Sequence, residues 1–243
     1  MLVPIIAREV DPGHGLVSMP YVFGPAGDLY VFGGASTAGG CVTWFRELLR
    51  SDGAELDAVD LALLETCARD IPAGAEGLVF LPYLMGERSP IWDGRASGAF
   101  VGLTLYHKRA QLYRAILEGV AFALRHNMDA GMRGAAELDD ALIVVGGAAK
   151  SDLWMQIIAD VIDRPVLTIE EDVEAAMGDA LLAAYAVGLA SEREVRDGWV
   201  TLRPRAQPRA AAKRVCDARY ATYLALYPAL KDIMHAMRDK PNA

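Results

Sequence analysis

Leu142-Ile-Val-Val-Gly-Gly-Ala-Ala-Lys-Ser151 is the stretch that decides the fold class of this chain. Its first four residues are apolar and three of them are β-branched, which predicts a buried parallel strand. Gly146 and Gly147 follow at the carboxyl end, where the missing Cβ atoms would let a ligand approach the main chain. Ser151 is predicted to cap a helix over 152–163. Because a helix start favours anions and polar ligand edges, we interpret the unit as half of a nucleotide site.

Two well-known glycine motifs are excluded at this turn. A dinucleotide fingerprint requires G-x-G-x-x-G, whereas Gly146 and Gly147 are adjacent and no third glycine follows them. A P-loop requires G-x-x-x-x-G-K-[ST], and here Lys150-Ser151 provides the ending without the preceding glycines. A tight strand-to-helix turn without a ligand stays open as the alternative.

Composition predicts a globular protein that does not bind nucleic acid. The chain has 243 residues, of which 53% are hydrophobic, and its formal net charge is −8. The basic residues between 203 and 214 are spread among alanines and prolines, which predicts a solvated linker before the last helix.

Cysteines, histidines and apolar runs indicate the compartment. Cys41, Cys67 and Cys216 form no C-x-x-C pair, which is typical of free thiols in a reducing, cytoplasmic compartment. No apolar run reaches the eighteen residues of a membrane span. The four histidines are scattered, and the sequence predicts no metal site.

Alternating strands and helices predict an α/β fold in which sheets and helices form layers. A long loop over 83–97 is typical of a functional or mobile segment. Pro204 and Pro208 predict a loop before the closing helix. Strands are expected at 28–34, 77–82, 98–103, 142–145 and 165–169, and helices at 36–50, 56–68, 108–130, 152–163, 177–189 and about 211–237.

Two further motifs carry a resemblance to a known family. Gly98-Ala-Phe-Val-Gly-Leu103 is followed after seven residues by Gln111-Leu-Tyr-Arg-Ala-Ile-Leu-Glu118, and this pair resembles the second signature of the FGGY carbohydrate kinases. The stretches over 80–90 and 39–46 are similar to that family's loop before the signature and to its first nucleotide-contacting helix. The resemblance is to the C-terminal domain, most closely in the xylulokinase-like branch.

This resemblance implies an actin-like ATPase, or ribonuclease H-like, domain with a mixed sheet flanked by helices. It implies one domain over 1–243, in which 191–243 forms a C-terminal loop and the closing helix. The family's N-terminal domain supplies the sugar pocket, a phosphate-binding hairpin and the aspartate base, and we expect it to be absent here. Asp11 lies in a Pro/Gly turn and Asp28 just ahead of a strand, so neither replaces the base. No catalytic residue is assigned, and the chain alone is expected to be inactive.

The resemblance also assigns candidate nucleotide contacts. Gly39 and Thr43 match positions that touch nucleotide in related glycerol kinases, and Gly147 and Ser151, with Gly146 beside them, match the adenine-side contacts. A bare glycine permits a flat base to stack on the backbone, and a hydroxyl can donate to a ring nitrogen or a ribose oxygen. The alternative for Thr43 is an ordinary threonine on a helix surface.

Other tempting residues are given structural roles. Gly178 is interpreted as a packing glycine that lets its helix lie close to the pocket, and Glu87 with Arg88 as a loop ion pair. The acidic run at 170–174 predicts a solvated segment rather than a Mg²⁺ site, since the family holds its metal mainly from the other domain.

The sequence thus predicts the nucleotide-binding half of an ATP-dependent carbohydrate kinase that acts on a pentulose such as xylulose. When complete, such an enzyme transfers the γ-phosphoryl of ATP to a sugar hydroxyl with Mg²⁺ present. ATP and ADP are the expected ligands, and a sugar is expected only together with an N-terminal domain. The alternative is a non-catalytic module: a pseudokinase remnant, a subunit completed by a separate N-terminal chain, or a homodimeric scaffold.

Overall fold

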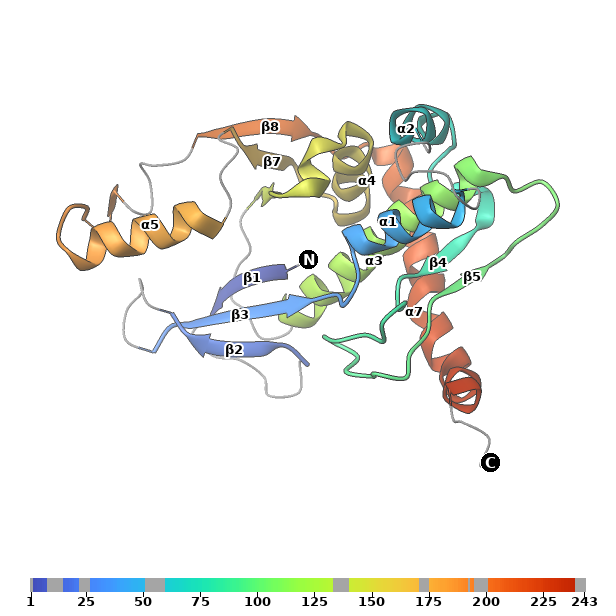
Figure 1. Ribbon diagram of the computed structural model, residues 1–243, viewed down its shortest axis with the longest axis horizontal. Coiled ribbons are helices and arrows are strands. Elements are labelled where there is room, and N and C mark those ends of the chain that lie inside the picture. Colours follow the sequence, from blue (N-terminus) through green and yellow to red (C-terminus); the bar gives the residue numbers. More distant parts are fainter. Residues whose placement is uncertain are drawn as a thin grey trace.

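A computed structural model describes residues 2–7, 15–21, 27–50, 60–132, 140–170, 175–191, 193–194 and 201–238 (Figure 1). The first sheet has the order β1-β3-β2 and is antiparallel throughout. It consists of β1 (Leu2–Ala7), β2 (Val17–Pro20) and β3 (Leu29–Gly34). The sequence predicted β3 but neither β1 nor β2. Pro4 is tolerated in β1 because β1 is an edge strand, where a missing N–H breaks no central ladder.

Two further sheets complete the framework. β4 (Val79–Leu81) and β5 (Ala99–Val101) pair antiparallel, as expected for two strands around a long loop. The third sheet has the order β6-β7-β8, with β6 (Leu142–Ile143) parallel to β7 (Val166–Ile169) and β8 (Leu202–Ala206) antiparallel to it. A mixed sheet is therefore confirmed.

Two predictions about this third sheet are wrong. β8 was predicted as a loop because of its proline, yet Pro204 is accommodated where β8 lies at the sheet edge, opposite Leu167 beside a register shift. The strand predicted at 142–145 is only two residues long, and it is not buried: Ile143 of β6 and Val145, just after β6, are each 48% exposed. These side chains line an open cavity and do not pack in the core. A run of apolar residues in the sequence looks the same in both environments.

The predicted helices are confirmed within a few residues at their ends, apart from 56–59, which lie outside the described part of the chain. α3 runs through the centre of the molecule and is buried along most of its length (Figure 1). None of the described helices combines the length and apolarity that a membrane span requires. The helices are α1 (Gly39–Leu48), α2 (Leu61–Arg69), α3 (Arg109–Met132), α4 (Asp152–Ile162), α5 (Ala175–Ala186) and α7 (Ala210–Arg238), with 3₁₀ turns η3 (Ala75–Gly77) and η4 (Gly147–Lys150).

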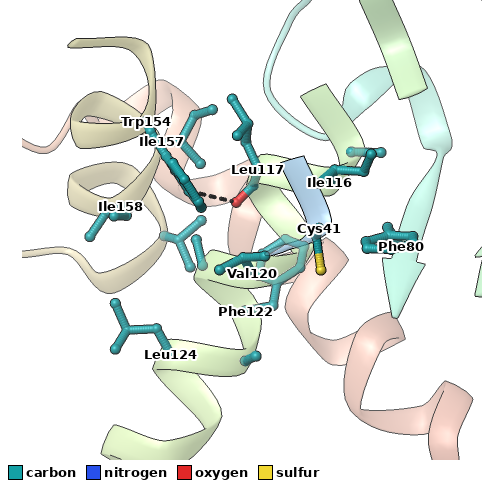
Figure 2. Close-up of a cluster of buried hydrophobic side chains, with 14 of the residues drawn as sticks. Cys41, Phe80, Ile116, Leu117, Val120, Phe122, Leu124, Trp154, Ile157 and Ile158 are labelled. Atoms are coloured by element: carbon teal, nitrogen blue, oxygen red, sulfur yellow. Dashed lines mark hydrogen bonds between the residues drawn. The ribbon is translucent and has the colours of Figure 1, made fainter. Parts of the chain in front are cut away.

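The core is built on both sides of α3 (Figure 2). Ile157 and Ile158 of α4 pack with apolar residues of α3, and the Trp154 indole Nε1 donates a hydrogen bond to the Leu117 carbonyl at 3.2 Å. Phe80 of β4 belongs to the same cluster. One face of α4 is apolar and buried, because its residues at 154, 157, 158 and 161 are all at most 5% exposed. This packing fixes α4, and with it the turn that precedes α4, on the rigid centre of the domain.

The long loop over 83–97 is held to the closing helix by a carboxylate. Asp93 Oδ2 accepts hydrogen bonds from the Tyr227 hydroxyl at 2.7 Å and from His235 Nε2 at 2.5 Å. Partial burial raises the pKa of Asp93, but the hydrogen bonds from Tyr227, His235 and the Arg95 N–H outweigh it and hold the pKa well below its usual range. The loop is therefore anchored at its middle.

Asp93→Asn is expected to lower the free energy of unfolding at pH 7 by about 1–3 kcal/mol, because an amide replaces a hydrogen-bonded carboxylate. A carboxylate whose folded-state pKa is lowered contributes its full stabilisation above the unfolded pKa, about 3.9, and loses it as the pH falls towards the folded-state pKa. The difference from wild type should therefore shrink as the pH falls below about 4. Urea unfolding at several pH values measures it, with Asp232→Asn on the exposed face of α7 as the control. An equal effect of the two variants would contradict the anchoring role.

Candidate nucleotide site

Residues that are far apart in the sequence meet around one cavity of about 630 Å³. Its walls come from α1, α2, α3, β6 and the segment over 147–154. Gly39 and Thr43 line it from α1, and Gly147 and Ser151 line it from the turn after β6. Gly146 is not among its lining residues, but directly precedes them. The structure thus brings four of the five predicted contact residues into one cavity.

The two lining glycines face open space. An ideal Cβ placed on Gly39 or Gly147 meets no heavy atom within 4 Å. A side chain at either position would therefore enter the cavity without displacing protein atoms. The role of these glycines in contacting a ligand stays a prediction.

Gly146 has a different role, since its φ of 80° and ψ of −164° are a conformation that favours glycine. We expect Gly146→Ala to destabilise the fold by about 1–3 kcal/mol, because the alanine must adopt this strained backbone. Thermal unfolding compared with Gly39→Ala, where the helix start accepts a Cβ, provides the measurement. Equal melting temperatures would show that Gly146 is not needed for backbone conformation.

Ser151 caps α4 as predicted. Its Oγ accepts a hydrogen bond from the Trp154 N–H at 3.1 Å, and the residue is 7% exposed. The hydroxyl hydrogen is still available to donate. The 3₁₀ turn η4, which begins at Gly147, lies between Gly146 and α4, so the helix begins one turn later than a direct strand-to-helix junction would place it.

The Arg205 side chain, on β8, stabilises the turn that precedes α4. Arg205 Nη1 donates to the Ala149 carbonyl and Nη2 pairs with Asp152, both at 2.6 Å. Arg209 and Lys213 also form ion pairs with acidic residues. The prediction of a solvated basic linker is therefore wrong for these three side chains, because carboxylates of α4 and α7 approach them only in the folded domain.

Thr43 is exposed on α1, and its hydroxyl donates to the Gly39 carbonyl at 3.5 Å. Thr43 is therefore a helix-surface threonine that also lines the cavity. Its position fits both a nucleotide contact and an ordinary surface residue.

Sequence reasoning missed three polar residues of the cavity: Arg46, Glu65 and Tyr113. Burial raises the pKa of Tyr113, and the neighbouring Glu65 raises it further while Arg46 lowers it. Arg46 follows Gly39 and Thr43 along one face of α1, so helical spacing could have found it. Glu65 had no such signal, because only the packing of α2 brings it here.

The start of α1 is positioned by the loop around Glu87. Glu87 is 5% exposed, and its Oε1 accepts the N–H of Ser36 at 2.7 Å and that of Arg88 at 2.8 Å. Ser89 Oγ accepts the Gly34 N–H at 2.6 Å. Burial raises the pKa of Glu87, and the two backbone N–H groups oppose that shift. The predicted ion pair is therefore wrong: backbone donors hold Glu87.

The structure contradicts the role predicted for Gly178 and describes only one residue of the acidic run at 170–174. Gly178 is not a packing glycine, because an ideal Cβ there meets no heavy atom within 4 Å and α5 does not line the cavity. Glu170 is exposed, while residues 171–174 and Asp11 lie outside the described residues. Among the described residues, no three His, Cys, Asp or Glu side chains are placed to hold a metal ion.

Comparisons with known proteins decide the family. Residues 8–187 match the family model for the C-terminal domain of the FGGY family of carbohydrate kinases. The chain belongs to this family. The FGGY chain is 30% identical over 217 residues to a xylulose kinase of Bacillus subtilis, which covers 89% of this chain and 42% of that protein. It is 35% identical over 170 residues to a gluconokinase of Bacillus licheniformis, which covers 65% of this chain and 32% of that protein.

A solved structure agrees with the fold of this FGGY domain. The ligand-bound xylulose kinase from Lactobacillus acidophilus superposes with a TM-score of 0.81 at 27% identity, over 95% of this chain and 45% of that one. The predicted actin-like ATPase fold is confirmed. The chain spans less than half the length of each of these relatives.

Proposed function

We propose that residues 1–243 form one domain, the nucleotide-binding C-terminal half of an ATP-dependent carbohydrate kinase with a pentulose such as xylulose as substrate. The observation that carries this proposal is the cavity of about 630 Å³ that gathers Gly39, Thr43, Gly147 and Ser151. Apolar walls beside a few polar groups suit an adenosine moiety. The similarity to xylulose kinases supports the choice of sugar, and the similarity to a gluconokinase provides the main alternative.

In this proposal each residue holds or orients the nucleotide. Gly39 and Gly147 let the base or ribose lie against the backbone, and Ser151 donates a hydrogen bond to a ring nitrogen or ribose oxygen. Arg46 and Glu65 add one charge of each sign to the cavity wall. Because the resemblance implies that the family holds its phosphates and metal mainly from the N-terminal domain, this half is proposed to bind the adenosine end of the nucleotide.

A non-catalytic assembly module is the second candidate, since α5 and the residues after it expose apolar side chains. Leu182, Tyr185, Val187 and Leu189 are 42–81% exposed. An exposed apolar patch is typical of a surface that contacts a partner, which here would be an N-terminal half or a second copy. Sedimentation of the 243-residue chain across concentrations tests self-association.

Calorimetry with ATP and AMP tests the proposed function. The 243-residue chain is expected to bind both weakly, with dissociation constants that differ by less than about tenfold, because it contacts the base and ribose rather than the γ-phosphate. A strong preference for ATP would require a complete phosphate site in this chain and would contradict the proposal. Absence of binding to either nucleotide would contradict it as well.

A further inference from the structure

A second cavity, of about 370 Å³, lies where the end of α2, the turn over 71–73, α3 and the start of α7 meet. Three arginines are among the residues that line it: Arg69, Arg114 and Arg209. Asp70 is the one carboxylate among its described lining residues, and the remaining lining side chains are apolar. It shares no described lining residue with the nucleotide cavity.

Arg114 is a buried cation with unused donors. Its side chain is 3% exposed, and Nε pairs with Glu118 Oε1 at 2.7 Å. The two oxygens of Glu118 also accept the Gly74 N–H, at 3.0 and 3.1 Å. Glu118 is therefore satisfied by Arg114 Nε together with a backbone donor. Among the described residues, Nη1 and Nη2 of Arg114 make no hydrogen bond, which leaves both terminal amino groups for a ligand in the cavity.

Arg209 is also satisfied on one side only. Its Nε and Nη2 donate to Asp160 Oδ2 at 3.1 and 2.6 Å, and its N–H donates to Oδ1 at 2.9 Å. The Asp160 carboxylate is thus held by the Arg209 guanidinium, the Arg209 N–H and the Gln156 side-chain amide. Nη1 of Arg209 makes no hydrogen bond within the described part of the chain.

Arg69 adds a positive charge to this wall. No hydrogen bond or ion pair joins its guanidinium to another described residue. The acids deeper in the protein, Glu118 and Asp160, are already paired, so they do not neutralise Arg69. Asp70 alone opposes it among the lining side chains.

We propose that this cavity binds the phosphate group of a small phosphorylated metabolite. Guanidinium groups match phosphate oxygens with paired N–H donors, so the unpaired amino groups of Arg114 and Arg209 and the guanidinium of Arg69 suit a phosphate dianion. A cavity of about 370 Å³ has room for more than a phosphate ion, and Ile71, Pro72 and Val215 offer apolar contact to the rest of the ligand. The two cavities share no described lining residue, so they are separate sites.

Thermal unfolding of the 243-residue chain tests the proposal with ribose 5-phosphate, inorganic phosphate, unphosphorylated ribose and sodium chloride at matched ionic strength. Ribose 5-phosphate is expected to raise the melting temperature saturably and more than inorganic phosphate, whereas ribose and chloride should not. No saturable effect of ribose 5-phosphate beyond chloride would overturn the proposal. Tighter binding of inorganic phosphate than of the ester would also overturn it, by identifying a free-ion site.

Three variants test whether ribose 5-phosphate binds in this cavity. Arg69→Gln should fold normally, because its charge has no protein partner, and should weaken ribose 5-phosphate binding about tenfold or more. Arg203→Gln, on the exposed edge strand β8, removes the same charge outside the cavity and should bind as wild type does. Ala211→Glu places a carboxylate at an exposed lining position in the first turn of α7, where an acid favours the helix, and should abolish binding. Equal binding by all three variants would refute the site.

Discussion

The 243-residue chain assayed alone is expected to release no ADP above background with any pentose, pentulose or sugar acid. The resemblance to FGGY kinases implies that the general base and the sugar pocket belong to the N-terminal half, and this chain matches the family's C-terminal domain. General-base help alone is worth about 10²–10⁴ in rate, and positioning of the reactants contributes up to about 7–11 kcal/mol of the barrier. Loss of both should reduce the rate below detection.

Adding an FGGY N-terminal half should restore the reaction. A coupled assay of ADP release, across a sugar panel that includes xylulose and gluconate, measures Mg²⁺- and ATP-dependent turnover with and without that half co-expressed. Complex formation should also raise the melting temperature of both parts, since each stabilises the folded state of the other. Turnover by the lone chain at ordinary kinase rates would show that it contains its own catalytic base, which contradicts the assignment.

Gly147→Val is expected to abolish nucleotide binding while the domain stays folded. The φ of Gly147 lies outside the left-handed region, and an ideal Cβ meets no heavy atom within 4 Å, so the backbone accepts a side chain. The added methyl groups then project into the cavity where the base or ribose is proposed to lie. A loss of affinity of about 100-fold or more corresponds to about 2.7 kcal/mol, a common cost for a steric block.

Gly178→Val is the matched control. It makes the same chemical change at a position that is equally open but belongs to α5, away from the cavity. Titration with ATP and thermal unfolding of both variants separate binding from stability. If Gly147→Val unfolds, the glycine is needed for backbone conformation. If it binds ATP as Gly178→Val does, the cavity does not hold the nucleotide.

The sequence by itself determined the units of the fold and the family. Each strand, glycine turn and helix unit is coded locally: apolar β-branched residues form the strand, Gly146 permits the turn, and Ser151 caps the helix that follows. The motif pair over 98–118 was enough to indicate the FGGY family, which the match over 8–187 confirms. These properties depend on neighbours within a few residues, so they can be read along the chain.

Tertiary structure alone decided what the other residues do. Ile143 has the pattern of a core residue, yet it lines an open cavity whose other walls include residues of α1, α2 and α3. Pro204 reads as a loop signal, yet it belongs to β8 because an edge strand can leave a backbone donor out. Glu65 lines the cavity of about 630 Å³, and Arg69, Arg114 and Arg209 line the second cavity, only because α2, α3 and α7 pack together. Residues up to about 140 positions apart in the sequence line the same cavity, and no local pattern along the chain encodes this arrangement.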